Sequence, residues 1–432
     1  MNLSSIFNSK QIRGAAIGSI LIKFLSAFFA LINGILLAQM LSVEDFGIYI
    51  LAFTTILVIT IPVSLGLPEL LTRYVSKYDT EKNFEAMKGL LIRSNQIVLV
   101  TSFIAILIAF ILYLLWWKNY SETIVITFWY SLVLLPVLVF GALRAATLRG
   151  LKYVVLGQMP DTFLRNLFLT LALVIVYFFN LEITPQKAMF FHCIAAVVAF
   201  FIGYLFLEFK ILKTLRSKIA IFETKFWLKE ATPFAITGGV QILKTRSLTY
   251  LLAIFGSLEA VAIFDVAMRG ASLVSFTVDA LNKAISPYIS SAFELQQKKT
   301  LQRIIKKTAR LIFILSIPIA LIFIIGGEAI VSWLFGNEYI ASYIPLIILC
   351  IGHIVNALSG PLAAVLNMTG NQTVLSKNQI LMMITSILLS IPLIYYYNVL
   401  GAAVVFSVVL LIQNSLLYVF TKRKLKLDTT VF

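Results

Sequence analysis

Long apolar runs recur along the whole chain and are separated by short polar segments. Each run is long enough for a helix to cross the hydrocarbon core of a bilayer, which takes about 20 residues. None alternates in the way that strands of an outer-membrane barrel do. The runs predict twelve membrane-spanning helices, at residues 14–40, 45–66, 92–116, 123–143, 157–179, 187–207, 234–256, 260–289, 309–326, 343–366, 378–397 and 401–420. The expected fold class is all-α, a polytopic integral membrane protein.

The composition supports this fold class. Hydrophobic residues make up 60% of the 432 residues, and charged residues only 12%, about half of the ~25% found in soluble domains. No polar segment is long enough to form a separate soluble domain.

Lys and Arg are divided unequally between the two sets of loops. Of the 35, 27 lie in the two terminal segments and in the loops after every second span, whereas the opposite loops hold only Lys118 and Lys187. Because basic loops stay in the cytoplasm during insertion, both termini are expected to be cytoplasmic. The net charge of +16 is then mainly this orientation signal, with attraction to anionic lipid headgroups, and it does not indicate nucleic-acid binding.

Two turns half the chain apart resemble each other. Ser42–Tyr49 joins spans 1 and 2, and Ser257–Phe264 joins spans 7 and 8, on the same side of the membrane. A parallel repeat of two six-helix lobes follows, an arrangement that commonly places a transport site between the lobes. The expected parts are an N-lobe with helices 1–6, a cytoplasmic linker, a C-lobe with helices 7–12 and a basic cytoplasmic tail, at residues 1–207, 208–233, 234–420 and 421–432.

Six cations remain, all away from the ends of the predicted spans: Lys23, Arg165, Lys244, Arg246, Arg269 and Lys283. A Lys or Arg at the centre of the bilayer costs roughly 2.5–3.5 kcal/mol on insertion scales, so such residues need a partner, water or a function.

Three of the six have an acid four residues earlier, which shares their helix face. The pairs are Asp161 with Arg165, Asp265 with Arg269, and Asp279 with Lys283. Structural pairing is the favoured interpretation, although the three cations could also line a cavity as secondary charges. The three acids could carry a coupling proton, as intramembrane carboxylates often do.

Lys23, Lys244 and Arg246 have no Asp or Glu three or four positions away. They lie on spans 1 and 7, the first helices of the two lobes. Cations in this position suit a polyanion such as a diphosphate, which Lys and Arg bind through charge-assisted hydrogen bonds. Pairing with an acid on another helix, or contact with water alone, remains open.

Motifs of soluble enzyme chemistry are absent from the sequence: there is no Walker A, HExxH or GxSxG pattern. Cys193 and Cys350 both fall inside spans, which argues against a disulfide framework or a thiol metal site. We therefore expect no catalytic residues, no metal and no cofactor, and we do not expect an enzyme.

Several short stretches resemble the polysaccharide transporter family of O-antigen and oligosaccharide-lipid flippases, within the multidrug/oligosaccharidyl-lipid/polysaccharide superfamily. They are Leu36–Tyr49, Leu65–Pro68 and Arg73-Tyr74 near the start, and Leu148–Leu151 with Gln158–Asp161 between spans 4 and 5. The likeness covers essentially the full length, including twelve spans in two lobes.

The resemblance implies a multi-pass protein of the bacterial inner membrane that moves an undecaprenyl-diphosphate-linked oligosaccharide to the outer leaflet by alternating access. It implies a cationic cavity between the lobes, which agrees with the choice of Lys23, Lys244 and Arg246. No ATP is needed, and a gradient of H⁺ or Na⁺ could drive the cycle. The expected partners are the lipid-linked sugar, membrane lipids and the polysaccharide polymerase with its chain-length machinery.

Three alternatives stay open. A drug or cation antiporter of the same superfamily should expose acids to its substrate, whereas here six cations stand against three acids in the spans. A flippase for lipid-linked peptidoglycan precursors typically has additional spans. A structural or assembly scaffold would transport nothing.

Overall fold

The computed structural model describes residues 10–116 and 121–431, and these ranges are helical with no strand. Lys118, assigned above to an outer loop, lies outside the described residues. Contacts within the chain define two compact units, Met1–Ile242 (unit 1) and Leu243–Phe432 (unit 2). Each unit is described by itself.

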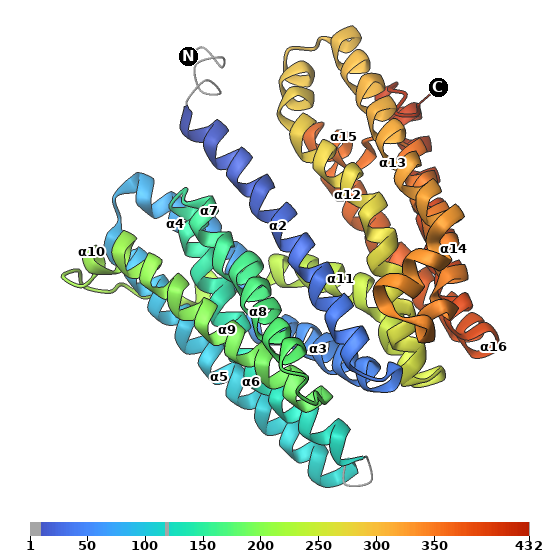
Figure 1. Cartoon of the computed structure of the whole chain (residues 1–432). Coiled ribbons are helices and arrows are strands. Elements are labelled where there is room, and N and C mark those ends of the chain that lie inside the picture. The colour runs from blue at the N-terminus through green and yellow to red at the C-terminus, as the bar shows by residue number, and fades with distance from the viewer. Residues whose placement is uncertain (1–9, 117–120, 432) are drawn as a thin grey trace. The chain divides into compact units, whose positions relative to one another are not determined.

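Unit 1 contains helices α2 to α10 and the first part of α11 (Figure 1). Their bounds are α2 Lys10–Met40, α3 Val43–Ser64, α4 Leu67–Glu81, α5 Phe84–Trp116, α6 Glu122–Gly150, α7 Val154–Gln158, η2 Met159–Leu164, α8 Arg165–Phe178, α9 Pro185–Leu207, η3 Glu208–Leu212, α10 Lys213–Leu215 and α11 Thr224–Phe255.

Unit 2 contains the second part of α11 and the helices that follow it. Their bounds are α12 Leu258–Glu294, α13 Lys298–Phe335, η4 Asn337–Ser342, α14 Tyr343–Leu358, α15 Leu362–Met368, α16 Gln372–Phe420 and η5 Thr421–Leu425. Figure 1 shows α12 and α13 packed side by side in this unit.

Ten helices in the described ranges are long and apolar enough to cross a membrane, and they include eleven of the twelve predicted spans. The predicted span 234–256 belongs to α11, which is not among the ten. Its sequence holds Lys244 and Arg246 in the predicted span and several charged residues before it, so its mean hydropathy is low. The multi-pass, all-α architecture is confirmed, with α11 as a helix of unusually polar composition.

The predicted spans 378–397 and 401–420 form one helical run, α16. Asn398 interrupts it with φ 49° and ψ −125°. A Cβ on Gly401 would lie 2.0 Å from the carbonyl oxygen of Leu393, so the chain folds back tightly here. The two halves are therefore separate helices of a hairpin, as the two predicted spans require.

The predicted span 343–366 is wrong at its end, because α14 stops at Leu358. Gly360 has φ +70°, which favours glycine because side chains with a Cβ clash in this region. Pro361, which follows, cannot continue a helical hydrogen-bond pattern. The chain then starts the short helix α15.

The repeated turns have a common structural basis. The Ser42 hydroxyl accepts a hydrogen bond from the Asp45 amide at 3.2 Å at the start of α3, and the Ser257 hydroxyl accepts one from the Ala260 amide at 3.1 Å at the start of α12. Each serine is thus a helix N-cap. The sequence similarity of the two turns reflects the same capping geometry.

In unit 1 the chain turns sharply between α3 and α4 at Leu65 and Gly66, both with positive φ. A Cβ on Gly66 would lie 2.4 Å from the Ala235 amide nitrogen and 2.5 Å from the Ala231 carbonyl oxygen. The first part of α11 therefore lies directly against this turn, and only glycine fits between the two backbones.

In unit 2 the segment after η5 folds back onto α13. The Gln302 side chain donates to the Asp428 carbonyl at 2.6 Å and accepts from the Asp428 amide at 3.0 Å. Lys306 Nζ donates to the Asp428 carboxylate at 2.8 Å. Leu427 is buried in an apolar cluster with Ile289 and Ile305. This segment is therefore an integral part of the unit.

Burial alone would raise the pKa of Asp428, but hydrogen bonds from Lys306 and Thr430 outweigh it and leave the pKa below its usual value. A carboxyl whose pKa is lowered by folding stabilises the docked segment above its unfolded pKa of about 3.9. This contribution is lost as the pH falls through the lower, folded pKa.

We predict that Asp428→Asn, which mimics the protonated acid, loosens this segment by about 1 kcal/mol, since the pair is partly exposed. Tryptic cleavage after Lys424 and Lys426 should then be roughly fivefold faster at neutral pH. Asp79→Asn, which removes an exposed pair with Lys82, serves as the control. Equal cleavage rates in wild type and Asp428→Asn would contradict the prediction.

Candidate functional site

Lys244 lies in the part of α11 that belongs to unit 2 and reaches α16. Its Nζ donates a hydrogen bond to Oε1 of Gln413 at 2.7 Å, and the side chain is half-buried. Gln413 is buried, as is the adjacent Asn414, which donates to Asn356 of α14 at 3.0 Å. A neutral amide satisfies one donor of the ammonium group but leaves its charge uncompensated.

Arg246 faces α12 instead. It follows Lys244 by two positions, so the two side chains point about 200° apart around α11. There Asp265 and Arg269 form the predicted pair, with Nε and Oδ2 2.5 Å apart. Arg246 interacts electrostatically with both of them. Two guanidinium groups therefore share one carboxylate, and with Lys244 this part of unit 2 carries a positive excess.

Two other predicted residues lie at exposed positions. Lys23 is exposed on α2 in unit 1 and takes part in an interaction within the protein. Because Lys244 and Arg246 belong to unit 2, a single cavity lined by all three stays a prediction. Lys283 is exposed on α12, and its pairing with Asp279 also stays a prediction.

The predicted pair of Asp161 with Arg165 is not a direct ion pair. Asp161 pairs instead with Arg144 of α6, at 2.6 Å, and only 3% of the Arg144 side chain is exposed, while Arg165 retains a longer-range electrostatic interaction with Asp161. The cause is η2, a π-helical turn in which the Arg165 amide bonds to the Pro160 carbonyl, five residues earlier. A π turn changes the angle between residues i and i+4, so Arg165 no longer lies above Asp161.

Arg144 is one of the 27 basic residues that were counted above in loops and termini, and for Arg144 this is wrong because it lies within α6, in the candidate span Glu122–Gly150. Its Nη1 donates to the Phe200 carbonyl of α9 at 2.8 Å. A Cβ on Gly203 would lie 2.0 Å from Arg144 Nη1, and one on Gly141 would lie 2.7 Å from the Asp161 carboxylate. Gly141 and Gly203 are the sequence signal that could have identified the site, because small residues let helices approach closely around a buried charge.

Arg165 has a different environment from the one predicted. It interacts electrostatically with Asp161 and Tyr49. The Tyr49 hydroxyl shares a hydrogen bond of 2.8 Å with His192 Nδ1. In the described part of the chain, the buried Nε of Arg165 has no hydrogen-bond partner. Unit 1 thus buries two arginines near one carboxylate, the same charge imbalance as in unit 2.

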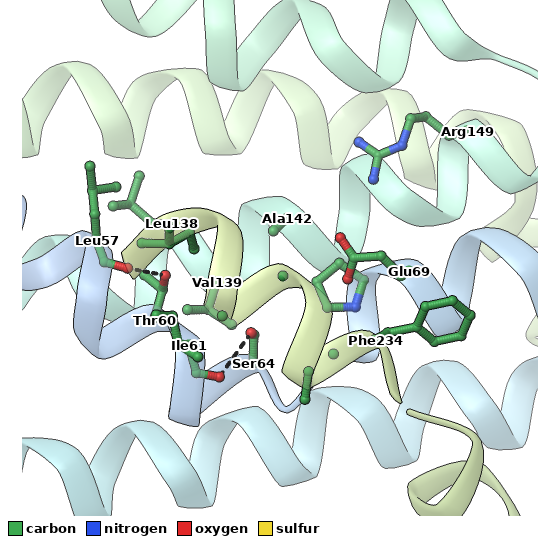
Figure 2. Close-up of a pocket in the computed structure, with 16 residues that line it drawn as sticks. Leu57, Thr60, Ile61, Ser64, Glu69, Leu138, Val139, Ala142, Arg149 and Phe234 are labelled. Carbon is green, nitrogen blue, oxygen red and sulfur yellow. Dashed lines mark hydrogen bonds between the residues drawn. The ribbon is translucent and has the colours of Figure 1, made fainter. Parts of the chain in front are cut away.

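Unit 1 also contains a cavity of about 290 Å³, which the sequence did not suggest. Figure 2 shows Leu57, Thr60, Leu138 and Val139 at one end and the two charged side chains, Glu69 and Arg149, at the other. The first part of α11 and the C-terminal end of α3 close its remaining sides (Figure 2).

Together the described side chains suit the binding of anions better than cations or metals. No group of three or more His, Cys, Asp or Glu residues in the described ranges could hold a metal ion. Asp161 and Asp265 are each paired with an arginine. Around Asp161 and around Asp265 the described side chains leave a positive excess, and Lys and Arg are the residues that bind phosphate groups.

The sequence profile of a family described as "Polysaccharide biosynthesis protein" matches residues 14–293. No curated protein matches the chain.

Solved structures with the same fold include an inward-facing multidrug resistance transporter of the MATE family and MOP superfamily. It is 14% identical, covers 95% of this chain and 98% of its own, and has a TM-score of 0.74. The lipid II flippase MurJ, in an inward closed conformation, is 14% identical over 94% of this chain and 87% of its own, with a TM-score of 0.73. A MOP superfamily transporter from Pyrococcus furiosus, whose binding pocket is described as having reverse polarity, is 15% identical over 96% of both chains, with a TM-score of 0.65. These likenesses identify the fold.

We predict that Arg144→Met lowers the free energy of unfolding by about 3 kcal/mol, because it leaves the carboxylate of Asp161 without its partner in a buried site. Thermal unfolding in detergent measures the effect.

Arg216→Met is the matched control, since it removes the exposed arginine that pairs with Glu208 and should cost less than about 1 kcal/mol. The double variant Arg144→Met/Asp161→Leu should recover part of the loss, because no charge is then left alone. Equal stability of Arg144→Met and Arg216→Met would show that the buried pair does not have this role.

Proposed function

The chain belongs to the polysaccharide biosynthesis protein family, and from this we propose that it is a flippase for an undecaprenyl-diphosphate-linked oligosaccharide. It would carry one repeat unit of O-antigen or another surface polysaccharide from the cytoplasmic to the outer leaflet of the bacterial inner membrane. The fold shared with transporters and with a lipid II flippase supports this function.

The observation that carries the proposal is the excess of cations in unit 2. Lys244 has a neutral amide partner, and Arg246 and Arg269 share the carboxylate of Asp265. Placing uncompensated cations within a membrane is costly, and such residues generally mark a substrate pathway. A diphosphate would supply the missing negative charge.

In this mechanism Lys244 and Arg246 reach the diphosphate from two different faces of α11, and Gln413, Asn414 and Asn356 offer hydrogen-bond groups on the Lys244 side. The sugar occupies a wet cavity while the prenyl tail remains in the lipid. The protein thereby lowers the main barrier, which is the transfer of charge and hydroxyl groups through hydrocarbon. Alternating access of the two lobes completes the proposed cycle.

The remaining predicted residues have secondary roles in this proposal. Lys23 would add a cation from α2, and Arg165, Arg269 and Lys283 would adjust the potential of the cavity. Lys283 is exposed, so its contribution is the smallest. No enzymatic step and no cofactor is required.

The energy source and the surroundings of the protein belong to the same proposal. A gradient of H⁺ or Na⁺ would drive the cycle, with Asp161 or Asp265 as the acid that changes its partner. Both termini would face the cytoplasm, and the polysaccharide polymerase and chain-length machinery would receive the product.

Transport of organic cations is the less favoured function. Such a site needs carboxylates inside the spans that a cation can reach, and two of the three acids predicted there, Asp161 and Asp265, are bound to arginines. The fold alone does not separate the two functions, since a multidrug transporter has it as well.

We predict that Lys244→Ala and Arg246→Ala each slow translocation by tenfold or more, because a hydrogen bond to a charged group contributes about 1.5–3 kcal/mol. The measurement is the appearance of a labelled undecaprenyl-diphosphate oligosaccharide in the opposite leaflet of reconstituted liposomes. Lys229→Ala is the control, because Lys229 is exposed on the same helix.

Arg246→Lys should restore only part of the rate, since Lys keeps the charge but loses the planar fork that matches phosphate. Wild-type rates in both Lys244→Ala and Arg246→Ala would refute the assignment of the site.

A further inference from the structure

The charged groups that line the cavity of unit 1 lie at one end of it. Glu69 and Arg149 lie at one end, and Leu57, Ile61, Leu138 and Val139 line the other (Figure 2). Leu138 precedes Arg149 by eleven residues on the same helix, an axial distance of about 16 Å. A ligand for this cavity should therefore be an amphiphile with its charge at one end.

The depth of the cavity in the membrane can be inferred from the helices that form it. Arg149 is the next-to-last residue of the candidate span Glu122–Gly150, and Glu69 follows the end of the span Val43–Ser64 by five residues. Both charges are thus at the level where spans end, which is the headgroup region. Leu57 and Leu138 are inside their spans, at the level of hydrocarbon.

The two charged groups are opposite in sign and available for a ligand. Arg149 interacts electrostatically with Glu69 and with Asp161, but within the described residues neither Glu69 nor Arg149 forms an ion pair. Glu69 would repel a purely anionic head, and Arg149 would repel a purely cationic one. A head that carries a phosphate and an amine fits both, with the phosphate on Arg149 and the ammonium on Glu69.

We propose that this cavity binds a membrane phospholipid with a zwitterionic amine–phosphate headgroup, of the phosphatidylethanolamine class. The volume of about 290 Å³ is near the lower end of the ~300–1,000 Å³ usual for ligand pockets. It therefore takes the headgroup and the adjoining part of the lipid, while the acyl chains extend into the bilayer. This site is distinct from the cations of unit 2 and does not depend on the proposed transport substrate.

The chain offers a steric test of this site. Gly238 of α11 lines the cavity, and a Cβ built on it meets no atom within 4 Å. Gly238→Leu should therefore fill the cavity without disturbing the helices around it. Gly326→Leu is the matched control, since a Cβ on Gly326 of α13 meets only a side-chain atom of Ile330, at 3.9 Å.

The experiment is native mass spectrometry of the protein released from nanodiscs that contain equal amounts of phosphatidylethanolamine and phosphatidylglycerol. Wild type and Gly326→Leu should retain phosphatidylethanolamine at least fivefold over phosphatidylglycerol, and Gly238→Leu should retain neither lipid above background. Arg149→Gln should reduce the retention of both lipids. Glu69→Gln should remove the preference by admitting the anionic lipid, whereas Glu81→Gln, an exposed acid on the same helix, should not.

Three results would overturn the proposal. The first is equal retention of the two lipids by wild type, and the second is undiminished retention by Gly238→Leu. The third is binding of soluble phosphoethanolamine as strongly as of the lipid, which would assign the site to a soluble metabolite.

Discussion

Hydrocarbon offers no water to polar groups, and this constraint determines where the charges of the protein lie. A buried arginine needs a carboxylate, a carbonyl or a ligand. Arg144 has the first two, from Asp161 and Phe200. Two glycines, Gly141 and Gly203, are packed against this pair, so the absence of a side chain at these two positions follows from the need to bury one ion pair.

Unit 2 leaves the larger excess of cations, and this excess carries the functional argument. Lys244 has one amide oxygen, and Arg246 and Arg269 both interact with the carboxylate of Asp265. In unit 1 two arginines, Arg144 and Arg165, lie near the carboxylate of Asp161. A positive excess in spanning helices costs free energy unless an anion binds there. The incomplete pairing of these cations is therefore what a binding site for an anion would show.

The sequence was sufficient for features that depend on composition and local geometry. Apolar runs located the spans, and the i,i+4 spacing of Asp265 and Arg269 gave the correct pair because α12 is a regular helix there. The same rule failed for Asp161, because a π turn has no recognisable sequence pattern. Arg144 was missed because a residue near the end of an apolar run looks like part of a loop. The cavity beside Gly238 depends on how α11 packs against other helices, which no local pattern encodes.

The π turn at Met159–Leu164 has a consequence for how this chain tolerates change. A π turn holds about one residue more than an α-helical turn, so it can be regarded as an insertion absorbed within a spanning helix rather than in a loop. In a regular helix one inserted residue would rotate everything that follows by about 100°. Asn166, which donates to the Ser26 backbone, and Thr170, which donates to Asn33, would then leave α2. The π turn takes up that rotation, so homologous chains that lack one residue at this point should keep the same polar face, with an α-helical turn in place of the π turn.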